Sequence, residues 1–151
     1  EGSCPIVGCD RSGWALDEAR ETWSAFGLAG RARRGDLPRG APQPEAGDLW
    51  CCGWFVSELD EATRADLLRR LRRAVRRGGH VLVAEPLSTR VSPWWEEWAG
   101  AFARDEVRSE LIRVSIRRPR FVAEMDKAAR LDHQVIGARV LIGPPAAPSG
   151  V

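Results

Sequence analysis

Apolar and polar residues alternate in the first part of the chain in a way that predicts a strand followed by a helix. A short apolar run ends at Asp10 and predicts a buried strand over residues 5–9. Ser12 has a suitable side chain to cap a helix, and Gly27 or Gly30 has the backbone freedom to end it. The apolar residues of this helix recur at helical spacing and are Leu16, Ala19, Trp23 and Phe26.

The middle of the chain repeats this rhythm. Residues 31–34 are expected to form a strand, mainly because of their place in the pattern, and residues 38–47, with three prolines and two glycines, a loop. A buried strand is predicted over residues 48–56. A helix follows, which Asp60 can cap and which the glycine pair 78–79 stops. The core stripe of that helix consists of Leu67, Leu68, Leu71 and Val75.

The clearest strand is predicted over residues 80–84. Ser92, followed by Pro93, predicts the start of a third helix, because proline suits the first helical position. Strict alternation of apolar and polar residues over 112–117 predicts a half-exposed strand. The third helix carries bulky aromatic residues along one side, namely Trp94, Trp95, Trp98 and Phe102.

A fourth helix is predicted over residues 121–129, a last strand over 135–142 and a flexible tail over 144–151. Strands that alternate with helices in this order are typical of right-handed βαβ units on a parallel sheet. We therefore predict an α/β, Rossmann-like fold in one domain over residues 1–143. Its sheet is mostly parallel and flanked by helices, with an antiparallel C-terminal strand.

Composition and charge narrow the function classes. The chain has 151 residues, 44% of them apolar, and a net charge of +2, so we expect one core and no strong attraction to nucleic acid or membranes. No apolar stretch approaches the roughly 20 residues of a membrane-spanning helix, and no signal peptide pattern opens the chain. The cysteines lack the paired spacing of a metal site, which favours reduced, mostly buried thiols in a cytoplasmic protein. These cysteines are Cys4, Cys9, Cys51 and Cys52.

Four segments resemble class I S-adenosylmethionine-dependent methyltransferases and follow one another in the order of that family. Residues 6–12 resemble its second strand, in which a terminal acidic residue holds the ribose hydroxyls of the cofactor, and Asp10 occupies that place. A carboxylate at the carboxyl end of a strand can accept both hydroxyl protons of a ribose. Residues 33–37 are similar to the segment after the third strand, so the implied contact to the adenine amino group falls on Asp36.

The other two segments lie further along the chain. Residues 48–59 are similar to the fourth strand and its exit, beside the methionine end of the cofactor and the acceptor, and residues 77–86 match the helix end and fifth strand. The resemblance covers residues 5–143 and implies S-adenosyl-L-methionine as the cofactor. The cofactor-binding residues that it implies are Asp10, Arg11, Asp36, Leu37, Cys52, Gly53 and Trp54, and the substrate-side candidates are Glu58 and Glu85.

Ordinary structural roles stay open for these candidates. Asp10 can cap the following helix or turn, and Asp36 lies in common turn chemistry. Glu58 falls in the first turn of a helix, where the helix dipole favours an acidic side chain, and Glu85 can simply shape a strand exit. Trp54 lies where an aromatic wall could pack on adenine or on an acceptor.

The glycine-rich turn that ends the first strand of this family is not recognisable. It belongs roughly 20 residues upstream of the acidic residue, and only nine residues precede Asp10. We therefore expect the first strand and its turn to be missing, and the chain, which opens on Glu1, to be the C-terminal part of a longer enzyme. In that case the chain alone binds the cofactor weakly or not at all. A degenerate relative of the family is the alternative.

A closer resemblance, to methyltransferase-like proteins associated with small ribosomal subunit assembly, rests on residues 55–59, the arginine-rich helix after them and residues 83–86. Those proteins carry a cysteine cluster for an iron–sulfur centre. No cysteine follows Cys52, so that centre is not predicted here. The arginines of the helix form either a solvated face or an RNA contact. The RNA contact would involve Arg69, Arg70, Arg73, Arg76 and Arg77.

Two functions from different classes follow. The first is methyl transfer from S-adenosylmethionine to an unidentified acceptor, in which the protein mainly positions the two partners and excludes water. The second is a non-catalytic, methyltransferase-like assembly factor that acts on RNA or the ribosome. A nicotinamide-dependent dehydrogenase would have a similar sheet of parallel strands and is a third possibility. The Arg-Gly-Gly turn at residues 77–79 and the antiparallel C-terminal strand suit methyltransferases better.

Overall fold

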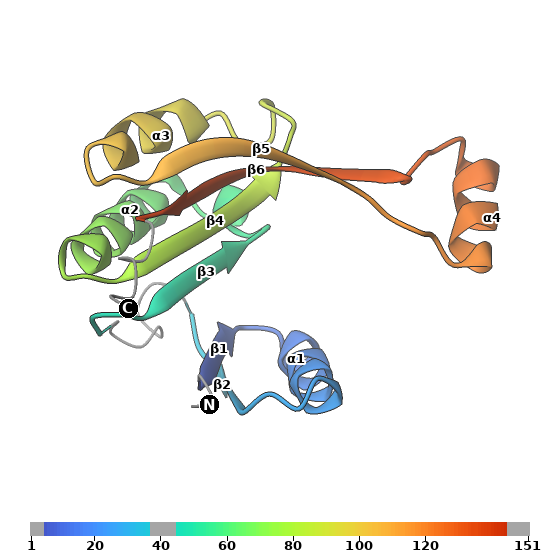
Figure 1. Cartoon of the computed structure of the whole chain (residues 1–151), viewed down its shortest axis with the longest axis horizontal. Helices are drawn as coiled ribbons and strands as arrows, with labels where there is room; N and C mark the ends of the chain where they lie inside the picture. Colours follow the sequence, from blue (N-terminus) through green and yellow to red (C-terminus); the bar gives the residue numbers. More distant parts are fainter. Residues whose placement is uncertain (1–4, 37–44, 145–151) are drawn as a thin grey trace, which may run out of the picture. The chain divides into compact units, whose positions relative to one another are not determined.

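The computed structural model describes residues 5–36 and 45–144, and its strands and helices follow the predicted order (Figure 1). No helix in these described ranges is long and apolar enough to cross a membrane. The chain divides into two compact units, residues 1–43 with 61–67 and residues 44–60 with 68–151. The strands are β1 (Ile6–Asp10), β2 (Gly30–Arg34), β3 (Leu49–Gly53), β4 (His80–Pro86), β5 (Arg108–Ser115) and β6 (Val135–Gly143). The helices are α1 (Gly13–Ala25), α2 (Glu61–Arg76), α3 (Trp95–Ala103) and α4 (Arg120–Ala129), with a 3-10 helix η1 (Val56–Glu58).

In the first unit, β1 and β2 form a two-stranded parallel sheet and α1 connects them. The predicted N-cap of α1 is confirmed, because Ser12 Oγ accepts a hydrogen bond of 3.3 Å from the backbone N–H of Ala15. The helix ends at Ala25, two residues before Gly27. Gly27 has a φ of +65°, a conformation that favours glycine, so it marks the predicted stop.

Trp23 packs on the sheet of the first unit because two facing positions are glycines. A Cβ at Gly8 would lie 2.7 Å from Trp23 Cη2, and one at Gly30 only 2.1 Å from Trp23 Cε3. The rest of the predicted stripe holds in part. Leu16 is buried, whereas Phe26 is 75% exposed, because Phe26 lies beyond the last helical residue. The helix therefore ends one residue before the last residue of the predicted apolar stripe.

The second unit contains a four-stranded sheet in the order β3-β4-β6-β5. β3 and β4 are parallel, whereas β6 runs antiparallel to both β4 and β5. Three strands therefore share one direction and β6 runs against them, which confirms the predicted antiparallel C-terminal strand in a mostly parallel sheet. Among the described residues, β1 pairs only with β2, and β3 pairs only with β4.

The helix positions match the apolar pattern closely. In α2, Leu67, Leu71 and Val75 of the predicted core stripe are buried, and Leu68 is half-buried. The glycine pair ends this helix, because Gly78 has a φ of +88° and the N–H of Gly79 donates to the Ala74 carbonyl at 3.0 Å.

The aromatic stripe of the third helix is confirmed, although the helix starts later than predicted. Its four aromatic residues are buried, and the Trp94 and Trp98 rings meet edge to face with centroids 4.6 Å apart. α3 begins at Trp95 rather than at Ser92 and Pro93, because these two residues form a turn in which the Ser92 carbonyl accepts from the Trp95 N–H.

The predictions of burial were less accurate for β3 and for the thiols. Leu49 is 60% exposed and Cys51 is exposed, while Cys52 is buried. A strand with one described neighbour leaves more of its surface open than a central strand does, so the prediction of a buried β3 is wrong. Cys9 is half-buried, and Cys4 lies outside the described residues.

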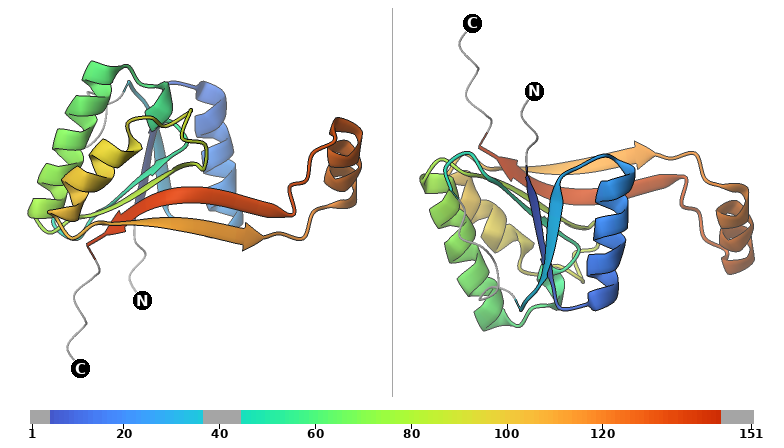
Figure 2. Two further views of the ribbon diagram at one scale, coloured as in Figure 1. Left: turned by 90° about the horizontal axis from the view of Figure 1, so that it is seen from above. Right: turned by 90° about the horizontal axis from the view of Figure 1, so that it is seen from below.

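β5 and β6 continue beyond β4 as a two-stranded ribbon with α4 at its far end, which both views of Figure 2 also show. β6 pairs with β4 only from Ala138 onward, so residues 135–137 pair with β5 alone. All eight residues of β5 are exposed. A strand was predicted over residues 112–117, and β5 begins four residues earlier; the expectation that one of its faces would be buried is wrong, and residues 113–115 pair with residues 135–137, beyond the part of β6 that β4 covers.

A buried carboxylate fixes α4 on the ribbon. Asp126 is only 5% exposed and accepts hydrogen bonds from Arg118 Nη1 and His133 Nδ1, each at 2.6 Å. The hydrogen bonds from His133 and Arg118 outweigh burial and lower the pKa of Asp126 to about 2. This network joins the two ends of the α4 segment.

We expect Gly30→Ala to loosen the first unit. The new Cβ would meet the Trp23 ring at 2.1 Å, and overpacking of this kind costs about 1–3 kcal/mol. Hydrogen exchange of the β1 and β2 amides measures the effect. Gly13→Ala is the matched control, because nothing lies within 4 Å of a Cβ at Gly13. Equal protection in the two variants would contradict the role of the Trp23 contact.

The Asp126 network gives a pH-dependent contribution to stability. The pKa of Asp126 is lowered from 3.8 to about 2, so the contribution is present above pH 3.8 and is lost as the pH falls through about 2. The difference in unfolding free energy between the protein and its Asp126→Asn variant should therefore shrink from pH 4 to pH 2. A difference that stays constant over this range would show that the network does not titrate as described.

Candidate functional site

The first candidate region is the carboxyl edge of the β1–β2 sheet in the first unit. Asp10 ends β1, is exposed, and accepts a hydrogen bond of 2.7 Å at Oδ1 from the backbone N–H of Ser12. Asp10 therefore has a local structural role at the start of α1, one of the two roles that the sequence left open. That bond occupies Oδ1, and the described residues place no hydrogen bond on Oδ2. A carboxylate held in this way can still bind a further ligand.

The residues after β2 lie at the same edge. The register pairs Asp10 with Arg34, so the chain leaves both strands side by side. Asp36 then comes within 3.8 Å of Arg11, measured from Oδ1 to Nε, with both side chains more than three-quarters exposed. The structure thus brings together Asp10, Arg11 and Asp36. Leu37, the remaining predicted residue here, lies outside the described residues.

The second candidate region is the exit of β3 and β4 in the second unit. Trp54 follows β3 with a φ of +53°, a left-handed conformation that is unfavourable for a bulky residue, and its N–H donates to the Ala84 carbonyl at 2.9 Å. Its side chain is 53% exposed. Non-glycine residues persist in this conformation only where neighbouring structure fixes them, and such residues cluster at ligand sites.

Glu85 supplies that fixation. It is 1% exposed, and its Oε1 accepts from the Val56 N–H at 2.9 Å while its Oε2 accepts from Ser57 Oγ at 2.8 Å. Ser57 Oγ also lies 3.1 Å from Ser92 Oγ. Both carboxylate oxygens are therefore bonded inside the protein. Of the two roles that the sequence left open for Glu85, this geometry corresponds to the shaping of the strand exit.

The remaining predicted residues of this region differ in accessibility. Gly53 is exposed, with nothing within 4 Å of where its Cβ would lie, and Glu58 is exposed in η1. Burial, together with the nearby Cys51 and Glu85, raises the pKa of the Cys52 thiol to about 12. Cys52 therefore stays protonated at neutral pH and packs as an apolar residue.

Sequence reasoning missed the serines that complete the Glu85 network. Ser57 and Ser92 are far apart in the chain, and no spacing rule connects them. The burial of Glu85 itself could have been predicted from the two-residue period of β4. Val81 and Val83 are both buried, and Glu85 follows them on the same face of the strand. A carboxylate on a buried face requires polar partners, which predicts a network without naming its members.

The arginine-rich helix has a structural use as well. Arg72 and Arg76 both donate from Nε to Asp105, which is nearly buried after α3. Burial raises the pKa of Asp105, but the hydrogen bonds from Arg72 and Arg76 outweigh burial and bring this pKa below its usual value. Arg76, one of the residues expected to contact RNA, is thus engaged in holding the fold.

Comparison with known proteins supports the fold. No family model matches the sequence, and no curated protein matches it. Among solved structures, the PH0226 protein from Pyrococcus horikoshii OT3 matches with a TM-score of 0.53 and 10% identity over 93% of this chain and 72% of that one. PH1948, a proposed RNA methyltransferase from Pyrococcus horikoshii, matches with a TM-score of 0.51 and 14% identity over 91% and 61% of the two chains.

A third structure agrees with these two. BH2331, a proposed methyltransferase from Bacillus halodurans C-125, matches with a TM-score of 0.51 and 11% identity over 92% of this chain and 81% of that one. Identities this low establish the fold and nothing further. The chain therefore has the Rossmann-like α/β fold seen in methyltransferase structures.

We expect Glu85→Ala to destabilise the second unit by about 2–4 kcal/mol, because it leaves the buried Val56 N–H without its acceptor and opens a cavity. Urea unfolding measures the loss. Glu58→Ala is the matched control, since Glu58 is exposed and surface changes stay within about 0.5 kcal/mol. Comparable midpoints for the two variants would show that the Glu85 network contributes little.

Proposed function

We propose that the chain contributes residues to an S-adenosyl-L-methionine site and takes part in methyl transfer to an acceptor not yet identified. The observation that supports this best is the strand arrangement, in which antiparallel β6 lies between β4 and β5 while β1 and β2, and β3 and β4, are parallel pairs. The dinucleotide-binding fold of dehydrogenases uses parallel strands in the order 3-2-1-4-5-6 and has no such inserted strand. The arrangement therefore favours the methyltransferase reading over the dehydrogenase reading.

Asp10 is the proposed partner of the cofactor ribose. Its carboxylate is exposed at the end of β1, and the Ser12 N–H holds Oδ1 in a fixed position. Asp36 is proposed for the adenine end. Its contact with Arg11 is exposed and at 3.8 Å, and exposed ion pairs contribute little energy, so the pair can open for a ligand.

The β3 exit is proposed for the methionine end and the acceptor. Gly53 leaves open space, and Trp54 presents an exposed indole on a backbone that Glu85 and Ala84 hold in place. An aromatic face of this kind can stack on a planar group or attract a cationic one. Cys52 contributes packing only, since its thiol stays protonated.

The chemistry expected of these residues is positional. When bound, the cofactor would supply a methyl group bonded to a positively charged sulfur. That sulfur is already activated as the leaving group. The protein then has to orient donor and acceptor and exclude water, and neither task needs a nucleophile of its own. No contact in the described part of the chain favours the assembly-factor alternative.

The test is calorimetric titration of S-adenosylhomocysteine into the complete gene product that contains this chain. We expect binding, and we expect Asp10→Ala to weaken it at least tenfold, because the variant removes the charged acceptor of two hydroxyl protons. Asp17→Ala is the control, since Asp17 lies on the exposed surface of α1, paired with Arg20. A folded protein that does not bind, or equal affinities for the two variants, would contradict the proposal.

A further inference from the structure

The polarity of α4 is the reverse of that of an ordinary surface helix. Asp126 is buried, while Phe121 and Met125, one turn apart on another face of the helix, are each 65% exposed. Leu131, which follows the helix, is also exposed. A surface helix usually turns its apolar face to the core and its charged face to water. The exposed apolar residues of α4 therefore indicate a partner rather than a core.

The Asp126 network fixes α4 in this orientation. Arg118, before the helix, and His133, after it, each bond to the Asp126 carboxylate at 2.6 Å. The Leu131 N–H donates to the Asp126 carbonyl at 2.8 Å and closes the end of the helix. A rotation of α4 that buried its apolar face would expose the Asp126 carboxylate and break both side-chain hydrogen bonds. The charged network therefore holds the apolar face toward solvent.

Exposed apolar residues continue from α4 onto the end of the ribbon that carries it (Figure 2). The register sets Val114 opposite Ile136, so these two exposed side chains lie on the same face of the ribbon. Ile116 and Val135 are exposed as well. We call residues 111–136 the ribbon tip. Apolar side chains that gather in one exposed region mark a binding surface, whereas scattered ones do not.

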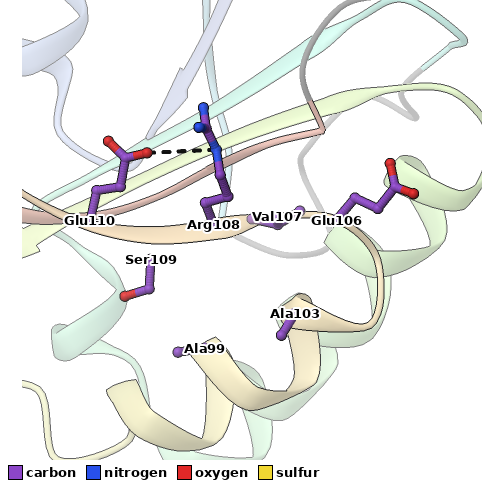
Figure 3. Close-up of a pocket in the computed structure, with 7 residues that line it drawn as sticks. All are labelled: Ala99, Ala103, Glu106, Val107, Arg108, Ser109 and Glu110. Carbon is purple, nitrogen blue, oxygen red and sulfur yellow. Dashed lines mark ion pairs between the residues drawn. The ribbon is translucent and has the colours of Figure 1, made fainter.

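The charges of β5 change along its length. Where β5 begins, beside α3, Arg108 and Glu110 form an ion pair with 3.6 Å between Nε and Oε1 (Figure 3). No acidic residue occurs over residues 111–120, and the ribbon tip as a whole has six basic residues and three acidic ones, one of which is the buried Asp126. The exposed basic residues of the ribbon tip are Arg113, Arg117, Arg120, Lys127 and Arg130.

This uneven distribution points to an anionic partner. The net charge of +2, on which the expectation of no strong attraction to membranes rested, averages over the whole chain and does not reveal the basic ribbon tip. A second copy of the ribbon tip carries the same charge, so pairing of two tips is disfavoured. A surface that offers both negative charge and apolar depth suits the basic and the apolar residues together.

We propose that the ribbon tip binds the surface of an anionic lipid bilayer. Phe121, Met125 and Leu131 enter the boundary between headgroups and acyl chains, and the surrounding basic side chains contact the headgroup phosphates. Single-stranded RNA, by contrast, is bound by aromatic rings on which its bases stack. Phe121 is the only Phe, Trp or Tyr of the ribbon tip, whose other exposed apolar residues are aliphatic or Met. The composition therefore favours lipid over RNA.

The test is flotation of the complete gene product with vesicles. We expect binding to vesicles of equal parts phosphatidylcholine and phosphatidylserine, little binding to phosphatidylcholine alone, and weaker binding as salt is raised. The variant Phe121→Ala with Met125→Ala should bind the anionic vesicles at least tenfold more weakly, because it removes the inserted side chains. Phe26→Ala is the matched control, since Phe26 is an exposed phenylalanine outside the ribbon tip, and should leave binding unchanged.

Charge reversal tests the electrostatic part of the proposal. Arg117→Glu with Arg130→Glu should weaken binding to the anionic vesicles at least tenfold, whereas Arg104→Glu, which reverses an exposed charge at the C-cap of α3, should not. Circular dichroism checks that each variant is folded.

Three outcomes would overturn the proposal. The first is a protein that floats with neither kind of vesicle. The second is binding that survives the paired substitution of Phe121 and Met125, which would place the contact elsewhere. The third is binding to single-stranded RNA, but not to vesicles, that the charge-reversal variant loses, which would identify nucleic acid as the partner.

Discussion

The buried carboxylate of Glu85 is the interaction on which the geometry of the second unit depends. A carboxylate in an apolar environment is strongly unfavourable unless hydrogen bonds compensate for the lost water. Here the Val56 N–H and the Ser57 hydroxyl supply those bonds from the segment that follows β3. β4 and that segment are therefore fixed to each other. Trp54, with its left-handed backbone, lies just before these two bonds, and its own N–H donates to the Ala84 carbonyl of β4.

The first unit has less packing to stabilise it than the second. Two strands and one helix bury little surface, and a sheet of two strands is marginal by itself. Trp23 compensates by covering Gly8 and Gly30, positions at which any larger side chain would displace its ring. The polar edge that carries Asp10 therefore lies on a unit with a small packed core. A ligand that bound at that edge would stabilise the folded unit.

Local patterns predicted the elements of this fold well, since caps, glycine stops and apolar periods act within a few residues. Ser12, Gly27 and the glycine pair 78–79 mark helix ends as their chemistry requires. Burial was predicted less well, because it depends on neighbours that the local sequence does not specify, as the exposed Leu49 and Cys51 show. Among the site residues, the sequence indicated which strand ends matter, but the hydroxyl partners of Glu85 come from distant segments and follow from tertiary structure alone.

The buried groups also bear on what chemistry the site can perform. Burial keeps the Cys52 thiol protonated, and Glu85 has both oxygens engaged, so neither is available as a nucleophile or a base. Arg72 and Arg76 are likewise committed to Asp105. Among the described residues, the accessible groups at the strand ends include the carboxylates of Asp10 and Glu58, the open position at Gly53 and the exposed Trp54 indole. Under the proposed function these groups would bind and orient the two reactants, because a methyl group on a positively charged sulfur is activated before it is bound and needs no nucleophile from the protein.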